Sequence, residues 1–304
     1  MINISVRNET STLRAVVLGT AERFGGVPSL EEAYDPKSKE HIRNGTYPKE
    51  ENLIKEMSGF AEVLEKYAVD VFRPNVINDY NQVYARDIGF VIDNIFIIPH
   101  ILSNRAREIE GIRYLIDQMP LNQVIEVPEG ARVEGGDVMP WDDHLFIGYS
   151  EAEDFNKYVV SRTNKMAVDF LTSCFPDRKV KAFELNKSDD DPKENALHLD
   201  CCFQPIGQDM AIVYKGGFKN LRDYEFLVHY FGKENIIEIT REEMYDMNSN
   251  VFSIAPKVIV SDIRFERLNG ILKRHGFVVE TIQYAETAKM EGLLRCSTLP
   301  LIRD

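Results

Sequence analysis

The sequence predicts an α/β fold made of five similar units, and three observations support this prediction. Apolar residues recur at helical spacing in five segments, at residues 49–67, 109–119, 166–174, 221–231 and 265–275. Short strand-like runs follow these helices, at residues 69–73, 124–127, 180–185, 236–239 and 277–281. In addition, a segment that begins with a polar residue and continues as a strand, a turn and usually a second strand occurs five times. One such unit at a nearly regular spacing is typical of a repeat architecture.

The five recurring segments begin with residues that carry chemistry, which are Asp87, Glu134, His198, Asn250 and Cys296. Their starts are separated by 47, 64, 52 and 46 residues. Five hairpin-plus-helix units wound in a ring would bring all of these starts to one central place. The alternative is the ordinary alternation of helices and strands in an α/β protein. That alternation does not explain why reactive residues recur at the same position of each unit.

The composition restricts the class of protein and its partners. The chain has 304 residues, with 36 Lys and Arg against 49 Asp and Glu, and its formal net charge is −13. Nucleic acids and anionic membranes bind basic surfaces, so we expect neither as a partner and favour cationic or neutral small molecules, or proteins, as ligands. No long apolar run is present, and residues 1–14 lack the pattern of a secretory signal. We therefore expect a cytoplasmic protein with a single domain over residues 1–304.

The four cysteines are Cys174, Cys201, Cys202 and Cys296, and they form neither a metal-binding nor a disulfide pattern. The sequence contains no C-x-x-C pair and no H-E-x-x-H motif, so it predicts no metal site. A disulfide scaffold does not suit a reducing compartment. We interpret Cys174, Cys201 and Cys202 as packing residues.

If the five starts meet, they supply the parts of a nucleophilic site. The thiolate of Cys296 would be the nucleophile. His198 would act as the acid and base because the ordinary pKa of histidine lies near neutrality, and Glu134 would hold its ring in one tautomer. Asp87 and Asp200 would repel an oxyanion, but they would bind a planar cation through paired hydrogen bonds. The electrophile implied by this set is a guanidinium carbon.

Four motifs resemble those of the guanidino-group-modifying superfamily, which includes arginine deiminase, dimethylarginine dimethylaminohydrolase and glycine amidinotransferase. They are Arg86-Asp87, Glu134-Gly-Gly-Asp137, His198-Leu-Asp200 and Arg295-Cys296-Ser-Thr-Leu-Pro. The resemblance extends from residues 13–19 to the end of the chain. It implies the pentein fold, a five-bladed αβ propeller with a central active site. It also implies that the reaction needs no metal and no organic cofactor.

The resemblance implies a role for each residue of the site. Cys296 attacks the guanidinium carbon while Asp87 and Asp200 hold its nitrogens. His198 protonates the departing amine, which leaves a thiouronium on the sulfur, and then takes a proton from the incoming water or acceptor amine. Glu134 orients His198.

Four further positions are less constrained by the motifs. The family places an Arg on the substrate carboxylate, and Arg162 in Ser161-Arg-Thr-Asn is the candidate here, after an insertion. The alternative for Arg162 is an exposed residue near a helix start. Asp137 is either a support for the site or a turn residue, and Asn250 is expected to support the site through backbone hydrogen bonds. Neighbouring strand residues point in opposite directions, so we leave Arg295 outside the site.

Two polar stretches, residues 19–52 and 186–195, predict loops because they are rich in Gly, Pro or charge. Each is either a lid or a surface excursion. The function we expect is hydrolysis of a guanidino compound, of the arginine deiminase or dimethylargininase type. The alternatives are transfer of the amidino group to an amine acceptor and a catalytically silent guanidine-binding or assembly protein. The sequence does not identify the substrate, the residues that bind its tail, or the oligomeric state, for which a homodimer would be unsurprising.

Overall fold

The fold contains five three-stranded sheets, and a computed structural model describes it for residues 2–304. Met1, the first residue of the expected domain, lies outside this range. Each sheet pairs two antiparallel strands and adds a third strand in parallel to one of them. The α/β class and the five predicted strand units are therefore confirmed.

Four of the sheets are built from consecutive strands, so each predicted hairpin forms one antiparallel pair. They are β3 (Phe90–Ile92), β4 (Ile95–Ile98) and β5 (Val124–Glu126); β6 (Val138–Trp141), β7 (His144–Tyr149) and β8 (Lys179–Glu184); β9 (Phe203–Ile206), β10 (Met210–Val213) and β11 (Ile236–Glu238); and β12 (Phe252–Ala255), β13 (Val258–Asp262) and β14 (Val278–Ile282).

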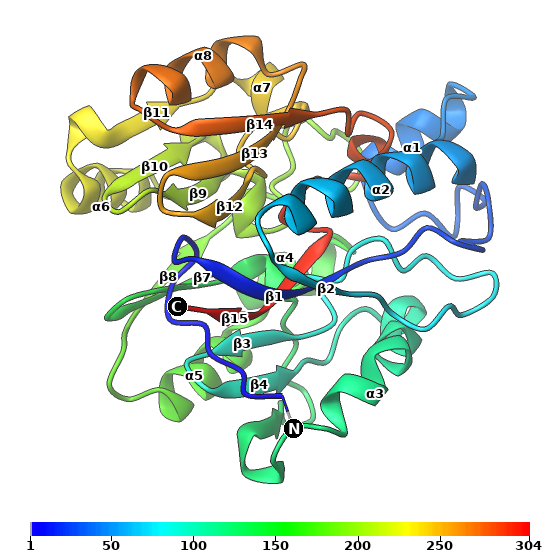
Figure 1. The fold of residues 1–304 in the computed structure, drawn as a ribbon, viewed down its shortest axis with the longest axis horizontal. Coiled ribbons are helices and arrows are strands. Elements are labelled where there is room, and N and C mark those ends of the chain that lie inside the picture. The colour runs from blue at the N-terminus through cyan, green and yellow to red at the C-terminus, as the bar shows by residue number, and fades with distance from the viewer. Residues whose placement is uncertain (1) are drawn as a thin grey trace.

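The fifth sheet joins the two ends of the described chain. It contains β1 (Leu13–Leu18), β2 (Asp70–Phe72) and β15 (Thr298–Arg303). β15 runs antiparallel to β1, with Leu18 opposite Thr298, and β2 runs parallel to β1. Figure 1 shows β1 in blue beside β15 in red, although they lie almost a whole chain apart in sequence. The segment that begins at Cys296 therefore finds its second strand near the N-terminus, which explains why no hairpin follows it.

The helices connect the strands and lie toward the outside of the molecule, where Figure 1 shows α3, α5, α6 and α8 on the rim. The α-helices are α1 (Pro36–Arg43), α2 (Glu50–Lys66), α3 (Arg113–Ile116), α4 (Ala152–Lys157), α5 (Lys165–Cys174), α6 (Leu221–Phe231), α7 (Arg241–Tyr245) and α8 (Glu266–Arg274). Short 3-10 helices are η1 (Ser103–Ile112), η2 (Leu121–Gln123), η3 (Gly135–Asp137), η4 (Leu199–Cys201), η5 (Lys215–Gly217), η6 (Lys233–Asn235) and η7 (Thr287–Met290).

Four of the five predicted helices, now α2, α5, α6 and α8, form close to their expected bounds. Polar caps explain two of the starts, since Asn164 and Asn220 accept hydrogen bonds from backbone N–H groups of α5 and α6. The helix predicted at 109–119 is wrong in part, because η1 occupies residues 103–112 and α3 has only four residues. The tighter 3-10 turn places residues three apart above one another, and Arg105 and Glu108 pair at that spacing over 2.7 Å.

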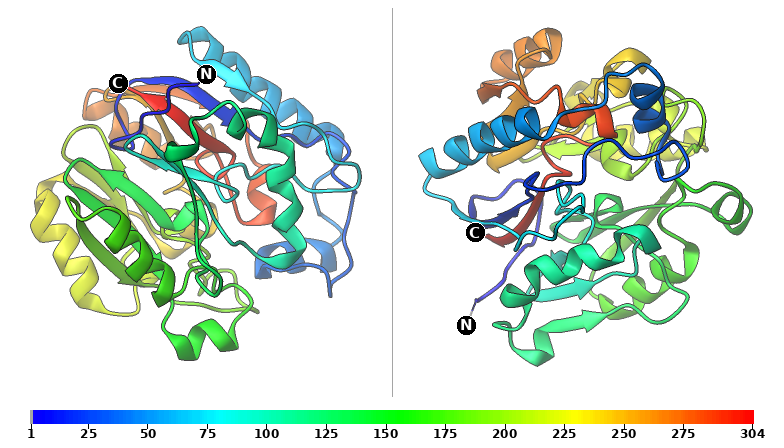
Figure 2. Two further views of the ribbon diagram at one scale, coloured as in Figure 1. Left: turned by 90° about the horizontal axis from the view of Figure 1, so that it is seen from below. Right: turned by 90° about the vertical axis from the view of Figure 1, so that its right-hand side faces the viewer.

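The segment 19–52 is not a loop throughout, because it contains α1 and the first residues of α2. The helix signal is Asp35-Pro36, in which Asp35 accepts a hydrogen bond from the Ser38 N–H at 2.7 Å and Pro36 stands at the first helical position. α1 packs against η7, and Figure 2 shows this N-terminal segment beside the C-terminal one. Within residues 2–304, no helix is both long enough and apolar enough to cross a membrane.

Candidate active site

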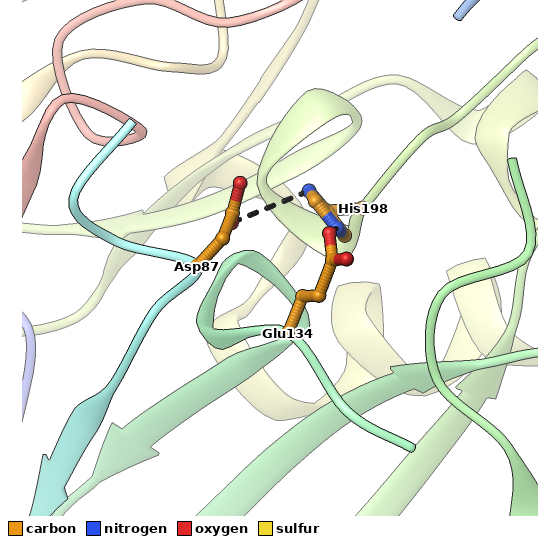
Figure 3. A group of neighbouring side chains, drawn as sticks. All are labelled: Asp87, Glu134 and His198. Carbon is orange, nitrogen blue, oxygen red and sulfur yellow. Dashed lines mark hydrogen bonds and ion pairs between the residues drawn. The ribbon is translucent and has the colours of Figure 1, made fainter. Parts of the chain in front are cut away.

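Three of the predicted site residues meet at a buried imidazole. His198 Nε2 lies 2.9 Å from Glu134 Oε2, and His198 Nδ1 lies 3.7 Å from Asp87 Oδ1. Figure 3 shows both carboxylates pointing toward the ring, each from a different segment of the chain. All three side chains are at most 4% exposed. The expected convergence of the first three repeat starts is therefore present.

The other two repeat starts meet at the thiol. Asn250 donates from Nδ2 to Cys296 Sγ at 3.1 Å, and its Oδ1 accepts the Cys296 N–H at 3.1 Å. Asp200 Oδ2 lies 3.5 Å from the same sulfur. Arg86, next to Asp87, donates its backbone N–H to the Cys296 carbonyl over 3.0 Å, which joins the thiol side to the imidazole side. Asn250 thus supports the site through its side chain as well as through backbone groups.

The Glu134-Gly-Gly-Asp137 motif is explained by close approach. A Cβ on Gly136 would lie 2.6 and 2.7 Å from Nδ1 and Cγ of the His198 ring, and a Cβ on Gly135 would lie 2.1 Å from the Arg86 carbonyl oxygen. Neither position has room for a side chain. Asp137 accepts the Leu199 N–H at 2.9 Å and so fixes the backbone next to His198. Of the two predicted roles for Asp137, support of the site is the one that this contact favours.

The charges around the imidazole favour its protonated form. Burial alone would lower the pKa of His198, but the carboxylates of Asp87, Glu134 and Asp137 raise it above its ordinary value. Burial would raise the pKa of Glu134, but the Arg162 guanidinium and His198 hold it well below its usual range. The site therefore holds an ionised Glu134 against an imidazole that readily accepts a proton.

The thiol has the opposite environment. Burial, followed by the charges of Asp200 and Asp87, raises the pKa of the Cys296 thiol well above its usual value. Asp87 Oδ1 is buried and has no hydrogen-bond partner among the described residues. An unsatisfied buried carboxylate oxygen costs free energy, and a bound cation would remove that cost. The centre therefore has an open acceptor on a carboxylate whose charge acts on the Cys296 thiol.

Arg162 is fully buried, which excludes the alternative of an exposed residue. Its Nη1 lies 3.1 Å from Glu134 Oε2, its Nη2 donates to the Tyr34 carbonyl at 2.9 Å, and its Nε donates to the Val159 carbonyl at 3.1 Å. Every guanidinium nitrogen therefore faces a protein acceptor. This geometry favours a role in holding Glu134.

Sequence reasoning missed two arginines that hold the site carboxylates. Arg105 donates from Nη1 to Asp87 Oδ2 at 2.7 Å, and no motif marked it. Arg295 donates from Nη1 to Asp200 Oδ2 at 2.8 Å. Leaving Arg295 outside the site was wrong, because residues 294–297 form a turn before β15 and strand alternation does not apply to them. The signal available in the sequence was a charged residue directly before the predicted nucleophile.

The imidazole and its two neighbouring carboxylates have residue types that bind metal ions elsewhere. Asp87, Glu134 and His198 offer ligand atoms within 4.8 Å of one another. However, the Nη1 atoms of Arg162 and Arg105 lie 3.1 and 3.7 Å from Glu134 Oε2. Glu134 is already neutralised by these guanidinium groups, and the two remaining ligands are fewer than a protein metal site normally uses. These residues do not fit a metal ion.

The sequence matches the family described as N,N dimethylarginine dimethylhydrolase, eukaryotic, over residues 31–270. The chain belongs to this family. It is therefore a member of the guanidino-modifying pentein superfamily, as the four motifs predicted. Among curated relatives of this dimethylarginine dimethylhydrolase family member, the uncharacterized protein YkgA of Bacillus subtilis (strain 168) is 27% identical, over 98% of this chain and 94% of that protein. An arginine deiminase of Limosilactobacillus reuteri (strain DSM 20016) is 26% identical, and the match covers 74% of this chain and 62% of the deiminase.

Two solved structures share the fold of this family member. The N-terminal domain of ArgZ, an arginine dihydrolase from the ornithine-ammonia cycle in cyanobacteria, superposes with a TM-score of 0.78 at 16% identity and covers 95% of this chain and 97% of that one. The inosamine-phosphate amidinotransferase StrB1 from Streptomyces griseus gives a TM-score of 0.76 at 16% identity, over 100% of this chain and 97% of that one. Guanidino-modifying hydrolases and transferases therefore share this fold.

Proposed function

We propose that this protein is a cysteine-dependent hydrolase of a guanidino compound, of the arginine deiminase or dimethylargininase type. The observation that carries the proposal is the open carboxylate oxygen of Asp87, which lies 3.7 Å from His198 Nδ1 and belongs to a carboxylate whose charge acts on the Cys296 thiol. A guanidinium held by Asp87 and Asp200 would place its carbon against the sulfur. Cys296, His198 and Glu134 are the proposed catalytic residues, and Asp87 and Asp200 are the proposed substrate-binding residues.

The substrate itself would activate the nucleophile. Burial, followed by the charges of Asp200 and Asp87, raises the pKa of the Cys296 thiol, so the thiol is protonated at neutral pH in the free enzyme. A bound guanidinium brings one positive charge to those carboxylates and lowers the cost of forming the thiolate. The nucleophile would therefore become reactive only when a cation occupies the site.

The reaction then proceeds in two steps that balance. The sulfur forms a bond to the guanidinium carbon, the thiol proton passes to the departing nitrogen through His198, and one C–N bond breaks to release a neutral amine or ammonia. A positively charged thiouronium remains on Cys296. Water adds to its carbon and gives one proton to His198, the C–S bond breaks with its electron pair and the second water proton passing to the sulfur, a neutral ureido compound leaves, and His198 releases its proton to the solvent. Glu134 holds the imidazole for both transfers.

Amidino transfer is the second candidate, because StrB1 and the amidinotransferase SxtG from Microseira wollei share the fold. The two reactions differ only in whether water or an amine reaches the thiouronium. The match to the dimethylarginine dimethylhydrolase family supports hydrolysis. The silent binding protein is the least supported alternative, because the Cys296 thiol, the His198 imidazole and the carboxylates of Asp87 and Asp200 lie in one buried cluster, which a binding role alone would not require.

Mass spectrometry of the products would test the proposal. Purified protein would be incubated with arginine, methylated arginines and other guanidines in labelled water, with and without glycine or ornithine. Hydrolysis predicts a ureido product that carries the water oxygen and forms without an acceptor. A product that needs the acceptor would establish transfer instead. Cys296→Ala is expected to abolish turnover with little loss of stability, and turnover by this variant would contradict the assigned nucleophile.

We further propose that the five sheets are the blades of one αβ propeller, which forms a single catalytic domain. The pairing of β1 with β15 supports this, since it joins the two chain ends in one sheet. All five repeat starts then supply residues to one centre. The proposed reaction needs no cofactor, because the covalent intermediate divides one difficult step into two easier ones.

A further inference from the structure

A pocket adjoins the proposed catalytic centre and is large enough for the tail of a small substrate. Its volume is about 340 Å³, and part of its wall comes from residues 24–47. Arg105 and Tyr84 line it and also touch Asp87: Arg105 Nη1 lies 2.7 Å from Asp87 Oδ2, and the Tyr84 carbonyl accepts the Asp87 N–H at 3.4 Å. A guanidino compound whose head group reached Asp87 would have its tail in this pocket.

The cations near this pocket are already paired. Arg105 is the one cationic residue in the lining, and it donates to both oxygens of Glu108 at 2.7 and 2.8 Å as well as to Asp87. Arg162 is bound to Glu134 and does not line the pocket. Arg23 stands farther out, in an adjoining hollow that Glu50 and Asp79 also line. A substrate carboxylate in the inner pocket would meet no unpaired positive charge.

The lining instead suits a positive charge. Phe24, Tyr34, Tyr47, Tyr80 and Tyr84 surround the space, and aromatic faces attract ammonium groups. The carboxylate of Asp35 also lines the pocket, although the side chain is only slightly exposed. Beside Asp35, Glu291 is 4% exposed, and its Oε2 has no hydrogen-bond donor among residues 2–304. Met290, the residue before Glu291, is part of the lining.

One cation lies near these two carboxyl groups, and it does not line the pocket. Lys37 is buried and donates to the Tyr245 carbonyl on its far side. Asn195 donates to Glu291 Oε1 at 2.7 Å and leaves the second oxygen open. Burial, followed by the charge of Asp35, raises the pKa of the Glu291 carboxyl well above its usual value, so Asp35 is the ionised carboxylate that faces the pocket.

We infer that this pocket binds the tail of the guanidino substrate and that the tail ends in an ammonium group rather than a carboxylate. The inference rests on the proposed function, since the pocket is identified by its place beside the proposed centre. The substrate class is a guanidinoalkylamine, of which agmatine is the simplest available probe. Asp35 is the specificity-determining residue, with Glu291 behind it.

Four compounds with the same head group would separate the tail charges: agmatine, 1-butylguanidine, 4-guanidinobutyrate and arginine. Binding would be measured by calorimetry on the Cys296→Ala variant, so that the result does not depend on turnover. We expect agmatine to bind about tenfold more tightly than 1-butylguanidine, the size of effect that one charge-assisted hydrogen bond gives. The two compounds that carry a carboxylate are expected to bind more weakly than agmatine by at least that factor. Tighter binding of arginine or 4-guanidinobutyrate would overturn the inference.

Asp35→Asn, combined with Cys296→Ala, would test whether Asp35 binds the ammonium group of the tail. The amide oxygen of Asn still accepts the Ser38 N–H, so the start of α1 is kept. The variant is expected to lose about tenfold in agmatine affinity and to bind 1-butylguanidine unchanged. Glu31→Gln is the matched control, since Glu31 is exposed and lies outside the lining. Equal losses for agmatine and 1-butylguanidine would overturn the assignment of Asp35.

The two proposals fail in different ways. If the wild-type protein turns over no guanidine, the proposed hydrolysis fails, while the order of affinities still decides the tail charge. If carboxylate-tailed guanidines are hydrolysed best, the proposed function holds and this inference fails.

Discussion

Arg295 donates to Oδ2 of Asp200 over 2.8 Å, and the same oxygen lies 3.5 Å from the Cys296 sulfur. The residue directly before the proposed nucleophile therefore fixes the carboxylate next to the thiol. The other guanidinium nitrogens of Arg295 form two 3.1 Å bonds to Glu9, and its Nη2 also donates to the Val138 carbonyl at 2.9 Å. One buried guanidinium therefore contacts the N-terminal segment, the second repeat and the carboxylate next to the thiol.

Arg295→Met is expected to destabilise the protein strongly, because it leaves the carboxylates of Glu9 and Asp200 buried without their partner. Removal of one member of a buried ion pair typically costs about 3–5 kcal/mol. Urea unfolding at neutral pH would measure the loss. Arg14→Met is the control, since both side chains of the Arg14–Asp304 pair are more than half exposed and such a pair contributes about 1 kcal/mol at most. Similar losses of unfolding free energy in the two variants would show that the buried ion pairs of Arg295 do not contribute this stability.

Gly136→Ala is expected to reduce turnover by about 100-fold or more, because its Cβ would displace the His198 ring from Glu134. Gly59→Ala serves as the control: Gly59 lies within α2 and has nothing within 4 Å of its Cβ position. That variant should keep full activity and gain about 0.5–1 kcal/mol of stability. Steady-state kinetics with both variants would check this prediction. Full activity of Gly136→Ala would show that the His198 ring does not pack against Gly136 in the active protein.

The strand units and the centre could be predicted from sequence because the same pattern of polar start and apolar strand recurs five times. Local patterns also predicted α2, α5, α6 and α8. They could not predict that β15 pairs with β1, because that contact depends on the two ends of the chain meeting. Arg105 and Arg295 were missed for the same reason: each is defined by the carboxylate it reaches, and those carboxylates lie 18 and 95 residues away. The helix at α1 was overlooked although Asp35-Pro36 is a start signal, since the surrounding Gly and Pro dominated the pattern.

The stability of the protein should fall at acid pH through Glu9. Burial alone would raise the pKa of Glu9, but Arg295 and Arg86 lower it from 4.5 to about 2. A carboxylate whose pKa is lowered in the folded state stabilises the fold fully at pH values above its unfolded-state pKa. This contribution is lost as the pH falls through the folded-state pKa of about 2. A shift of this size corresponds to about 3 kcal/mol.

Glu9→Gln would reveal this contribution. The unfolding free energy of the variant should lie below that of the wild type by a constant amount between about pH 5 and 7, and the difference should close between pH 4.5 and about 2. Glu51→Gln, at an exposed position in the first turn of α2, is the control, and it should change the unfolding free energy by about 1 kcal/mol at most. A gap for Glu9→Gln that stays constant down to pH 2 would contradict the assignment.

The last prediction separates the reactivity of the thiol from catalysis. Asp87 is one of the charges that raise the pKa of the Cys296 thiol, and it is also the proposed anchor for the substrate guanidinium. Asp87→Asn removes the charge and keeps the shape, so Cys296 in the free protein should be alkylated by iodoacetamide faster at pH 8, because the loss of that charge lowers the pKa of the thiol. Turnover should fall by about 100-fold or more because the anchor is lost.

Alkylation at Cys296 would be followed by peptide mass spectrometry, since the half-buried Cys174 would also react. Asp223→Asn, which removes a carboxylate paired with Lys181 far from the thiol, should change neither rate. If Asp87→Asn slowed both alkylation and turnover, Asp87 would be activating the thiol directly, and activation by the charge of the substrate would be wrong.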